Sequence, residues 1–131
     1  MVSWSVSDAQ MGGVLCQQSW DAVTAVSAGF GHTCAVRSDG QLVCFGANEL
    51  GQCDVPAELG PVRAVSAGFH HTCAVRSDGQ LVCFGDNREG QCDVPEELGP
   101  VTAVSASRTY TCAVRSDDQL ICFGEEFPRV E

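Results

Sequence analysis

Short segments in which apolar and polar residues alternate recur along the chain, and glycine or proline ends each of them. Residues 62–67 alternate in this way until Gly68. Residues 71–76 and 80–85 then flank the loop Ser77-Asp78-Gly79. A three-residue loop that ends in glycine is a strong signal for a β-hairpin. Each unit of this kind therefore predicts three short antiparallel strands.

The hairpin loop also fixes which residues face each other across the two strands. Counting outward from the loop places Cys73 opposite Cys83 at a non-hydrogen-bonded pair, where side chains come closest. The same register pairs four further cysteines: Cys34 with Cys44, and Cys112 with Cys122. The three pairs predict either buried facing thiols or cross-strand disulfides, and the sequence leaves both alternatives open.

The whole unit repeats every 39 residues, and two of its copies are identical at 33 of 39 positions. The chain divides into a degenerate end unit and three repeats, the last one truncated: residues 1–25, 26–64, 65–103 and 104–131. A fixed period of this size marks a propeller or a solenoid. Pro95 and Pro100 cannot donate to a strand ladder, so the segment around them connects one unit to the next. We expect one all-β domain, a partial β-propeller of about three blades built from 39-residue repeats.

Charge and cysteine content narrow the classes of partner and compartment. The net charge is -10, which disfavours binding to nucleic acid or to an anionic membrane. Nine cysteines favour an oxidising compartment. Residues 1–17, in contrast, lack the basic start and apolar centre of a secretory signal. We therefore expect no nucleic-acid or membrane partner. The expected location is cytoplasmic by default, and extracellular if the true start lies upstream.

The residues H-T-C-A-V-R-S-D-G-Q-L-V-C-F-G, preceded by A-V-S-A-G and followed by G-x-N-x-x-G-Q, resemble the repeat of the regulator of chromosome condensation family. The short period and the three-strand blade are most similar to the propeller-type β-lactamase inhibitor proteins. The likeness covers about Val23 to Gly124. The WD-repeat family has a similar period, but its Trp-Asp dipeptide is absent from the three repeats at residues 26–131.

This resemblance implies a rigid, non-enzymatic scaffold that presents loops to a protein partner. Relatives serve as exchange factors for a small GTPase, as modules of ubiquitin ligases and as secreted enzyme inhibitors. The sequence therefore predicts a protein-interaction module, with an inhibitor-like propeller or a fragment of a larger regulator as alternatives. Relatives form rings of about seven blades, so this chain is expected to associate with itself to complete a ring, or to be part of a longer propeller.

Besides the number of blades, one further departure and one packing expectation accompany the resemblance. Relatives usually carry tryptophan at the end of the hairpin, where this chain has phenylalanine. Five phenylalanines of the repeats are expected in the core or between blades: Phe30, Phe45, Phe69, Phe84 and Phe123.

Histidine and cysteine also occur at a spacing that suggests a metal site. Each of two repeats offers four ligand types, in one copy His71, Cys73, Cys83 and Cys92. The third copy has Tyr110 at the histidine position and no later cysteine, yet it keeps the facing pair. The pair is therefore independent of the other two residues. We expect no metal, no cofactor and no catalytic residue.

Six positions differ between the two near-identical copies, and they indicate a candidate partner-binding rim. Residues that change while strand, turn and core stay fixed are expected to face solvent, and loops on a rigid scaffold commonly carry recognition. The predicted rim consists of loop residues: Ala47, Glu49, Leu50, His70, Asp86, Arg88 and Glu89. Neutral drift at exposed sites explains the same differences equally well.

Overall fold

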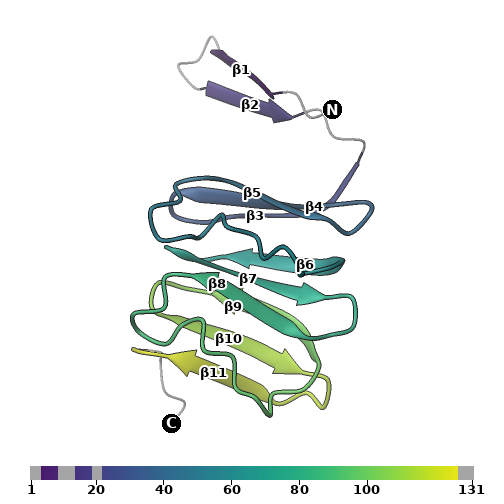
Figure 1. Ribbon diagram of the computed structural model, residues 1–131, viewed down its shortest axis with the longest axis vertical. Helices are drawn as coiled ribbons and strands as arrows, with labels where there is room; N and C mark the ends of the chain where they lie inside the picture. The colour runs from purple at the N-terminus through teal and green to yellow at the C-terminus, as the bar shows by residue number, and fades with distance from the viewer. Residues whose placement is uncertain (1–3, 9–13, 19–21, 127–131) are drawn as a thin grey trace.

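The computed structural model describes residues 4–8, 14–18 and 22–126. These residues form eleven β-strands and no helix (Figure 1), which confirms the all-β prediction. Within this part of the chain, no helix is long and apolar enough to cross a membrane.

Three antiparallel sheets of three strands each make up the body of the protein, and each sheet is one blade. The blades follow one another along the chain. Blade 1 contains β3 (Val23–Ala28), β4 (His32–Arg37) and β5 (Leu42–Gly46). Blade 2 contains β6 (Val62–Ala67), β7 (His71–Arg76) and β8 (Leu81–Gly85). Blade 3 contains β9 (Val101–Ala106), β10 (Tyr110–Arg115) and β11 (Leu120–Gly124). The chain is thus a partial propeller of three blades.

The degenerate end unit contributes a separate two-stranded sheet. Strand β1 (Trp4–Asp8) pairs antiparallel with β2 (Val14–Gln18), and Val6 lies opposite Cys16. Residues 1–3, 9–13 and 19–21 of this unit lie outside the described residues.

The hairpin register is the one that the Ser-Asp-Gly loop predicts. In blade 2, Cys73 lies opposite Cys83 and Val75 opposite Leu81. The backbone N–H of Arg76 donates to the carbonyl of Gln80 across the loop. Cys34 and Cys112 face Cys44 and Cys122 in the same way.

Neighbouring blades are joined along their first strands. The backbone N–H of Ala67 in β6 donates to Ser27 Oγ of β3 at 2.9 Å, and Ala106 in β9 donates to Ser66 Oγ of β6 at 2.9 Å. Strands β3, β6 and β9 therefore form the inner edge of the arc, and Figure 1 shows the three sheets stacked face against face.

The hydrophobic core lies between blades. Successive residues of one strand point to opposite faces, so Ala74 packs toward blade 1 while Cys73 and Val75 pack toward blade 3. One cluster joins blades 1 and 2: Cys34, Val36, Leu42, Leu59, Val62 and Ala74. The next cluster repeats it between blades 2 and 3: Cys73, Val75, Leu81, Leu98, Val101, Ala113 and Phe123.

Candidate functional site

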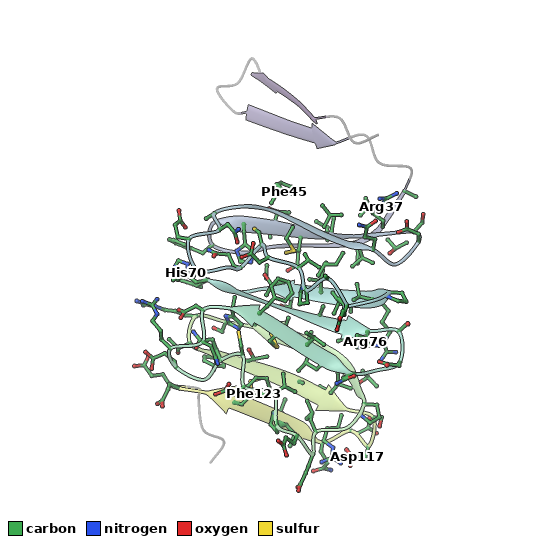
Figure 2. All side chains as sticks on the ribbon, viewed as in Figure 1. Arg37, Phe45, His70, Arg76, Asp117 and Phe123 are labelled. Carbon is green, nitrogen blue, oxygen red and sulfur yellow. A yellow bond between two sulfur atoms is a disulfide. The ribbon has the colours of Figure 1, made fainter. Side chains whose placement is uncertain are left out.

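The blades present two different ends to solvent. The hairpin turns lie at one end, close to Arg37, Arg76 and Asp117, whereas His70 lies at the opposite end (Figure 2). The opposite end carries the loops after the first strands, at residues 29–31, 68–70 and 107–109. The loop that leaves each third strand begins beside them, because the N–H of Asp86 donates to the carbonyl of His70.

A row of stacked side chains crosses the three blades at this end. The rings of Phe30 and Phe69 are nearly parallel, with centroids 4.9 Å apart and an interplanar angle of 7°. The guanidinium carbon of Arg108 lies 5.9 Å from the centroid of the Phe69 ring, within the range of a cation–π contact. These three residues occupy the same position in successive repeats, and we call them the aromatic ladder.

The two phenylalanines of the ladder are exposed although they are large and apolar. Phe30 is 69% exposed and Phe69 37%. Phe30 and Phe69 stack between neighbouring blades, which is one of the two expected placements, and they do so at the exposed end of the blades. The reason is the backbone: Phe30 N donates to Gly68 O and Phe69 N to Ser107 O, each at 3.2 Å. The loops are thus held against each other through their main chains.

Glycine permits this close approach of the loops. A Cβ atom placed on Gly29 would lie 2.3 Å from the carbonyl oxygen of Gly68, and one on Gly68 would lie 2.4 Å from that of Ser107. Such contacts are too short for any side chain, so the ladder depends on these two glycines. Residues of the three loops line a shallow hollow of about 290 Å³ beside the ladder.

The predicted rim lies at the same end as the ladder, but its members differ in exposure. His70 is half-buried and its ring meets Phe30 edge-on, with centroids 5.9 Å apart. Ala47 and Leu50 are half-buried, and Glu49, Arg88 and Glu89 are exposed. Partner binding by the rim remains a prediction.

Asp86 corrects the expectation that every differing position faces solvent. Its side chain is buried, and it accepts hydrogen bonds from Arg88 Nε at 2.8 Å and from Arg88 Nη2 at 3.0 Å. The hydrogen bond from the Arg88 side chain lowers the pKa of Asp86. The substitutions of Ala47 by Asp86 and Glu49 by Arg88 are therefore coupled, because the second supplies the counter-ion for the first.

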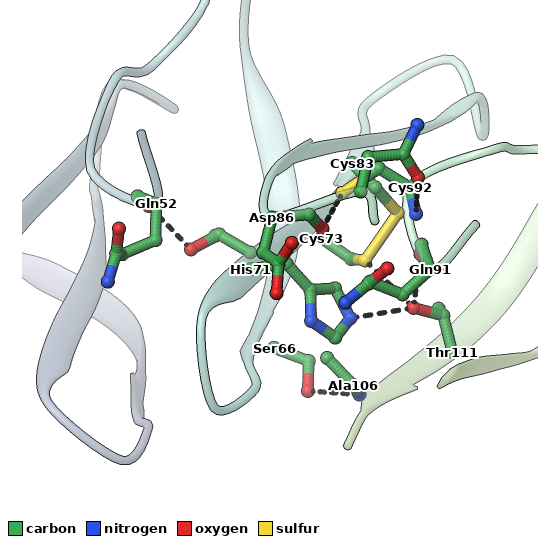
Figure 3. The surroundings of a disulfide bond; sticks show 12 residues. Gln52, Ser66, His71, Cys73, Cys83, Asp86, Gln91, Cys92, Ala106 and Thr111 are labelled. Carbon is green, nitrogen blue, oxygen red and sulfur yellow. Dashed lines mark hydrogen bonds between the residues drawn. A yellow bond between two sulfur atoms is a disulfide. The ribbon is translucent and has the colours of Figure 1, made fainter. Parts of the chain in front are cut away.

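Buried polar residues form hydrogen bonds between neighbouring blades. The side chain of Thr111 donates to the carbonyl of Gln91 at 2.8 Å, and His71 Nε2 lies 2.8 Å from the same hydroxyl (Figure 3). Thr111 has a single hydroxyl proton, so His71 must donate through Nε2–H. His32, Thr72 and Gln52 repeat the arrangement between blades 1 and 2.

His71 is therefore neutral. Its Nδ1 is buried without a hydrogen-bond partner, so a second proton there would be unsolvated. Burial lowers the pKa of His71 to about 4, and the charge of Asp86 opposes this only in part. The pKa of His32 is lowered for the same principal reason.

The cysteines of the three repeats fall into two groups. Disulfides join Cys34 to Cys44, Cys73 to Cys83 and Cys112 to Cys122, with Cα atoms 4.1, 4.1 and 4.0 Å apart. These Cα separations are slightly shorter than the usual disulfide range, because each pair lies directly opposite at a non-hydrogen-bonded position.

The thiols of Cys53 and Cys92 are not bonded to another sulfur. Each lies 3.3 Å from a backbone carbonyl to which it donates, and burial raises the pKa of Cys92 to about 12. Burial raises the pKa of Cys53 as well. Among the described residues, no group of three or more His, Cys, Asp or Glu side chains is placed to hold a metal ion.

Comparison with known families finds a match in the first two blades. Residues 23–52 and 62–91 are similar to the Regulator of chromosome condensation (RCC1) repeat. Each match ends at a buried glutamine, Gln52 or Gln91. Its backbone carbonyl accepts a hydrogen bond from the threonine hydroxyl of the following blade. No curated protein matches the sequence.

Solved structures share the fold at low sequence identity. The ectodomain of the Physcomitrella patens receptor kinase CR4 aligns with a TM-score of 0.71 and 23% identity, over 85% of this chain and 33% of that one. The ectodomain of the Arabidopsis thaliana receptor kinase ACR4 aligns with a TM-score of 0.68 and 21% identity, over 88% of this chain and 42% of that one. Prp20p from Saccharomyces cerevisiae aligns with a TM-score of 0.68 and 19% identity, over 78% of this chain and 33% of that one. The chain spans about a third to two fifths of the length of these proteins.

Proposed function

We propose that this chain, whose first two blades match the RCC1 repeat, is a non-enzymatic module that binds a protein partner through the aromatic ladder and the adjoining rim. The observation that carries the proposal is the exposed stack of Phe30, Phe69 and Arg108. Aromatic and arginine side chains dominate the binding energy of many protein interfaces, because they bury a large area and lose little conformational freedom.

The position of the ladder supports binding. Its backbone is fixed by hydrogen bonds between blades, so the rings are pre-organised and little entropy is lost when a partner docks. The structural relative Prp20p is described as binding Gsp1p and histones, and both of these are proteins. We take from that relative only the general inference that a blade scaffold of this kind recognises protein.

The chemistry of the described His and Cys residues argues against catalysis. Nucleophilic catalysis needs a thiolate or hydroxyl with an accessible base beside it. His32 and His71 are buried, neutral and engaged with threonine, and six cysteines are in disulfides. Cys53 and Cys92 have raised pKa values, so their thiolates are disfavoured at neutral pH.

The three disulfides favour a second candidate, an inhibitor-like propeller that acts in an oxidising compartment. In that case the partner is an enzyme, and the ladder or rim covers its active site. The two candidates share the same surface and differ in what the partner does, so the identity of the captured protein separates them.

The ladder is tested by comparing which proteins the chain retains. We expect Phe30→Ala combined with Phe69→Ala to release the partner, because truncating a hot-spot side chain costs about 2 kcal/mol or more. The matched control is Gln41→Ala combined with Gln80→Ala, which alters exposed positions at the hairpin end. Quantitative mass spectrometry of cross-linked complexes measures how much partner each of the two double variants recovers. Equal recovery by the two variants would contradict the proposal.

The rim is tested separately in the same experiment. Arg88→Ala combined with Glu89→Ala should weaken binding by about 1 kcal/mol or more if the rim contributes to the contact. Unchanged binding would restrict the site to the ladder and leave the sequence differences at the rim as drift.

A further inference from the structure

Two grooves open at the hairpin end of the blades, opposite the ladder. Groove 2 lies between the hairpin turn of blade 2 and the segment that leads to blade 3, and its volume is about 630 Å³. Groove 1 occupies the same place between blades 1 and 2, with a volume of about 470 Å³. Both volumes fall within the range of about 300 to 1,000 Å³ that is usual for ligand pockets.

Aliphatic side chains line both grooves. Leu81 and Leu98 lie in groove 2, where they are 3% and 4% exposed. Val94 is half-buried beside them and packs against the same core cluster. The corresponding residues of groove 1 are Leu42, Leu59 and Val55. A side chain that enters either groove therefore meets apolar surface.

The backbone holds the two sides of each groove in place. In groove 2, the N–H of Leu98 donates to the carbonyl of Pro95 at 3.1 Å, and the N–H of Val101 donates to the carbonyl of Gly79 at 2.9 Å. The same two hydrogen bonds recur in groove 1, also at 3.1 and 2.9 Å. The hairpin turn and the connecting segment are thus fixed relative to each other. Each groove is therefore formed before a ligand arrives, and little order is lost on binding.

Both charged residues that line groove 2 are acidic. The carboxylate of Asp78 lies 3.4 Å from the guanidinium of Arg76, so its charge is compensated within the chain. Arg63 lies close to the same turn and donates to the backbone carbonyl of Val101. Glu96 is exposed, and within the described residues it has no ion-pair partner. An uncompensated carboxylate thus stands beside an apolar groove.

We propose that groove 2 binds a segment of a protein partner in which an aliphatic side chain lies next to arginine or lysine. The aliphatic side chain is buried against Leu81, Leu98 and Val94, and the cation pairs with Glu96. This site lies at the other end of the blades from the ladder, so the proposal does not depend on what the ladder binds.

Groove 1 offers a comparison within the same molecule. It has the same aliphatic lining, but Ala57 stands where groove 2 has Glu96. This is one of the six positions at which the two near-identical repeats differ. Groove 1 therefore lacks the carboxylate that the proposal assigns to the cation.

The probe is the peptide acetyl-Arg-Leu-Leu-Arg-amide, titrated into the isotope-labelled chain and followed through the amide NMR signals. The titration extends to about 10 mM at physiological ionic strength, a range that saturates a contact with a Kd of about 1 mM. We expect the signals of Leu81, Val94 and Leu98 to shift in a saturable way, because these residues line groove 2.

Two matched peptides separate the charge from the apolar contact. The peptide acetyl-Glu-Leu-Leu-Glu-amide reverses the charge, and acetyl-Arg-Ala-Ala-Arg-amide removes most of the aliphatic surface. We expect each to bind at least about five-fold more weakly than the probe, since each lacks one of the two contacts.

Reciprocal substitutions test the role of the carboxylate. Glu96→Ala should raise the Kd of groove 2 about two- to five-fold, which is the effect of one exposed ion pair. Ala57→Glu should lower the Kd of groove 1 by a similar factor. Each variant carries the residue that the other repeat has at that position, so we expect both to fold, and the dispersion of the amide signals checks this.

The absence of a saturable shift in groove 2 would overturn the proposal, as would equal binding of the charge-reversed peptide. Kd values that neither substitution changes would overturn the assignment of Glu96. Shifts confined to residues 29–31 and 68–70 would place the peptide on the ladder and also contradict the proposal. Because the grooves and the ladder lie at opposite ends of the blades, failure here leaves the partner-binding proposal standing.

Discussion

At the residue scale, the buried histidines show how a repeat can place polar groups in its core. His71 is fully buried, yet its Nε2–H is satisfied by Thr111, which in turn donates to the carbonyl of Gln91. A hydrogen-bonded chain of this kind has only one consistent direction, and that direction requires a proton on Nε2 of His71. A second proton on the buried Nδ1, which has no hydrogen-bond partner, is disfavoured, so the ring is neutral.

This arrangement predicts a specific dependence of stability on pH. The pKa of His71 is about 4 in the folded chain and 6.5 in the unfolded chain. Below pH 6.5 the unfolded chain therefore binds the extra proton and the folded chain does not. Neutral His71 therefore contributes on the order of 3 kcal/mol to the unfolding free energy above about pH 6.5. This contribution is lost as the pH falls toward 4.

Urea denaturation at several pH values measures how the unfolding free energy depends on pH, and the His71→Gln variant is the comparison. Glutamine does not titrate in this range, so the difference in unfolding free energy between the two proteins should shrink as the pH falls from 6.5 to 4. Carboxylates near the site, Asp86 among them, titrate in both proteins and largely cancel in the difference. A difference that is constant across this range would contradict the assignment.

Single residues also mark where sequence reasoning fell short. The alternation of the strands indicates that His71 lies on a core-facing strand, but nothing in the sequence reveals its threonine partner 40 residues away. The exposure of Phe30 and Phe69 was equally hidden, because it depends on how closely neighbouring loops approach. The signal available was a phenylalanine preceded by glycine at the same place in two repeats.

At the scale of the element, the hairpin turn was the most predictable part of the fold. The third residue of the turn has φ +87° at Gly40 and +91° at Gly79, in the left-handed region. In blade 3 this residue is Asp118, with φ 71°. A Cβ on Gly79 would lie 2.9 Å from the Cβ of Pro100 in the segment that follows blade 2.

The geometry of the turns therefore predicts that two substitutions change the stability by unequal amounts. Asp118→Gly should stabilise the chain by less than ~1 kcal/mol, because it relieves only the left-handed conformation, which Asp tolerates better than most residues. The reciprocal change, Gly79→Asp, should destabilise it by about 2 kcal/mol or more, since strain and the clash with Pro100 add together. Thermal denaturation of both variants measures this, and effects of equal size would show that the proline contact is unimportant.

The loops between strands were less predictable than the turns. Sequence differences between repeats selected loop residues that lie at the same end of the blades as the ladder, but they gave the wrong exposure for Asp86. Comparing two copies shows which positions change, whereas it does not show that two changes compensate each other. The ion pair between Asp86 and Arg88 is such a compensation.

At the scale of the whole molecule, stability comes from contacts between neighbouring blades. The period of 39 residues predicted the blades and their order, because every copy repeats the same strand and turn signals. It did not predict that the core lies between sheets, with Cys73 in the buried cluster and Cys112 at an open face. In such an array the middle blade is covered on two faces and an end blade on one.

This difference predicts that equivalent disulfides contribute unequally. Cys73–Cys83 and Cys112–Cys122 have the same sequence separation of 10, so each constrains the unfolded chain by a similar ~2 to 3 kcal/mol. Replacing the middle pair by alanine should cost about 1 kcal/mol more than replacing the end pair, because only Cys73 is fully buried in a core cluster. Urea denaturation of the two double variants at the same low protein concentration measures the difference. Equal costs would mean that chain entropy alone accounts for both disulfides and that packing between the blades adds nothing at Cys73.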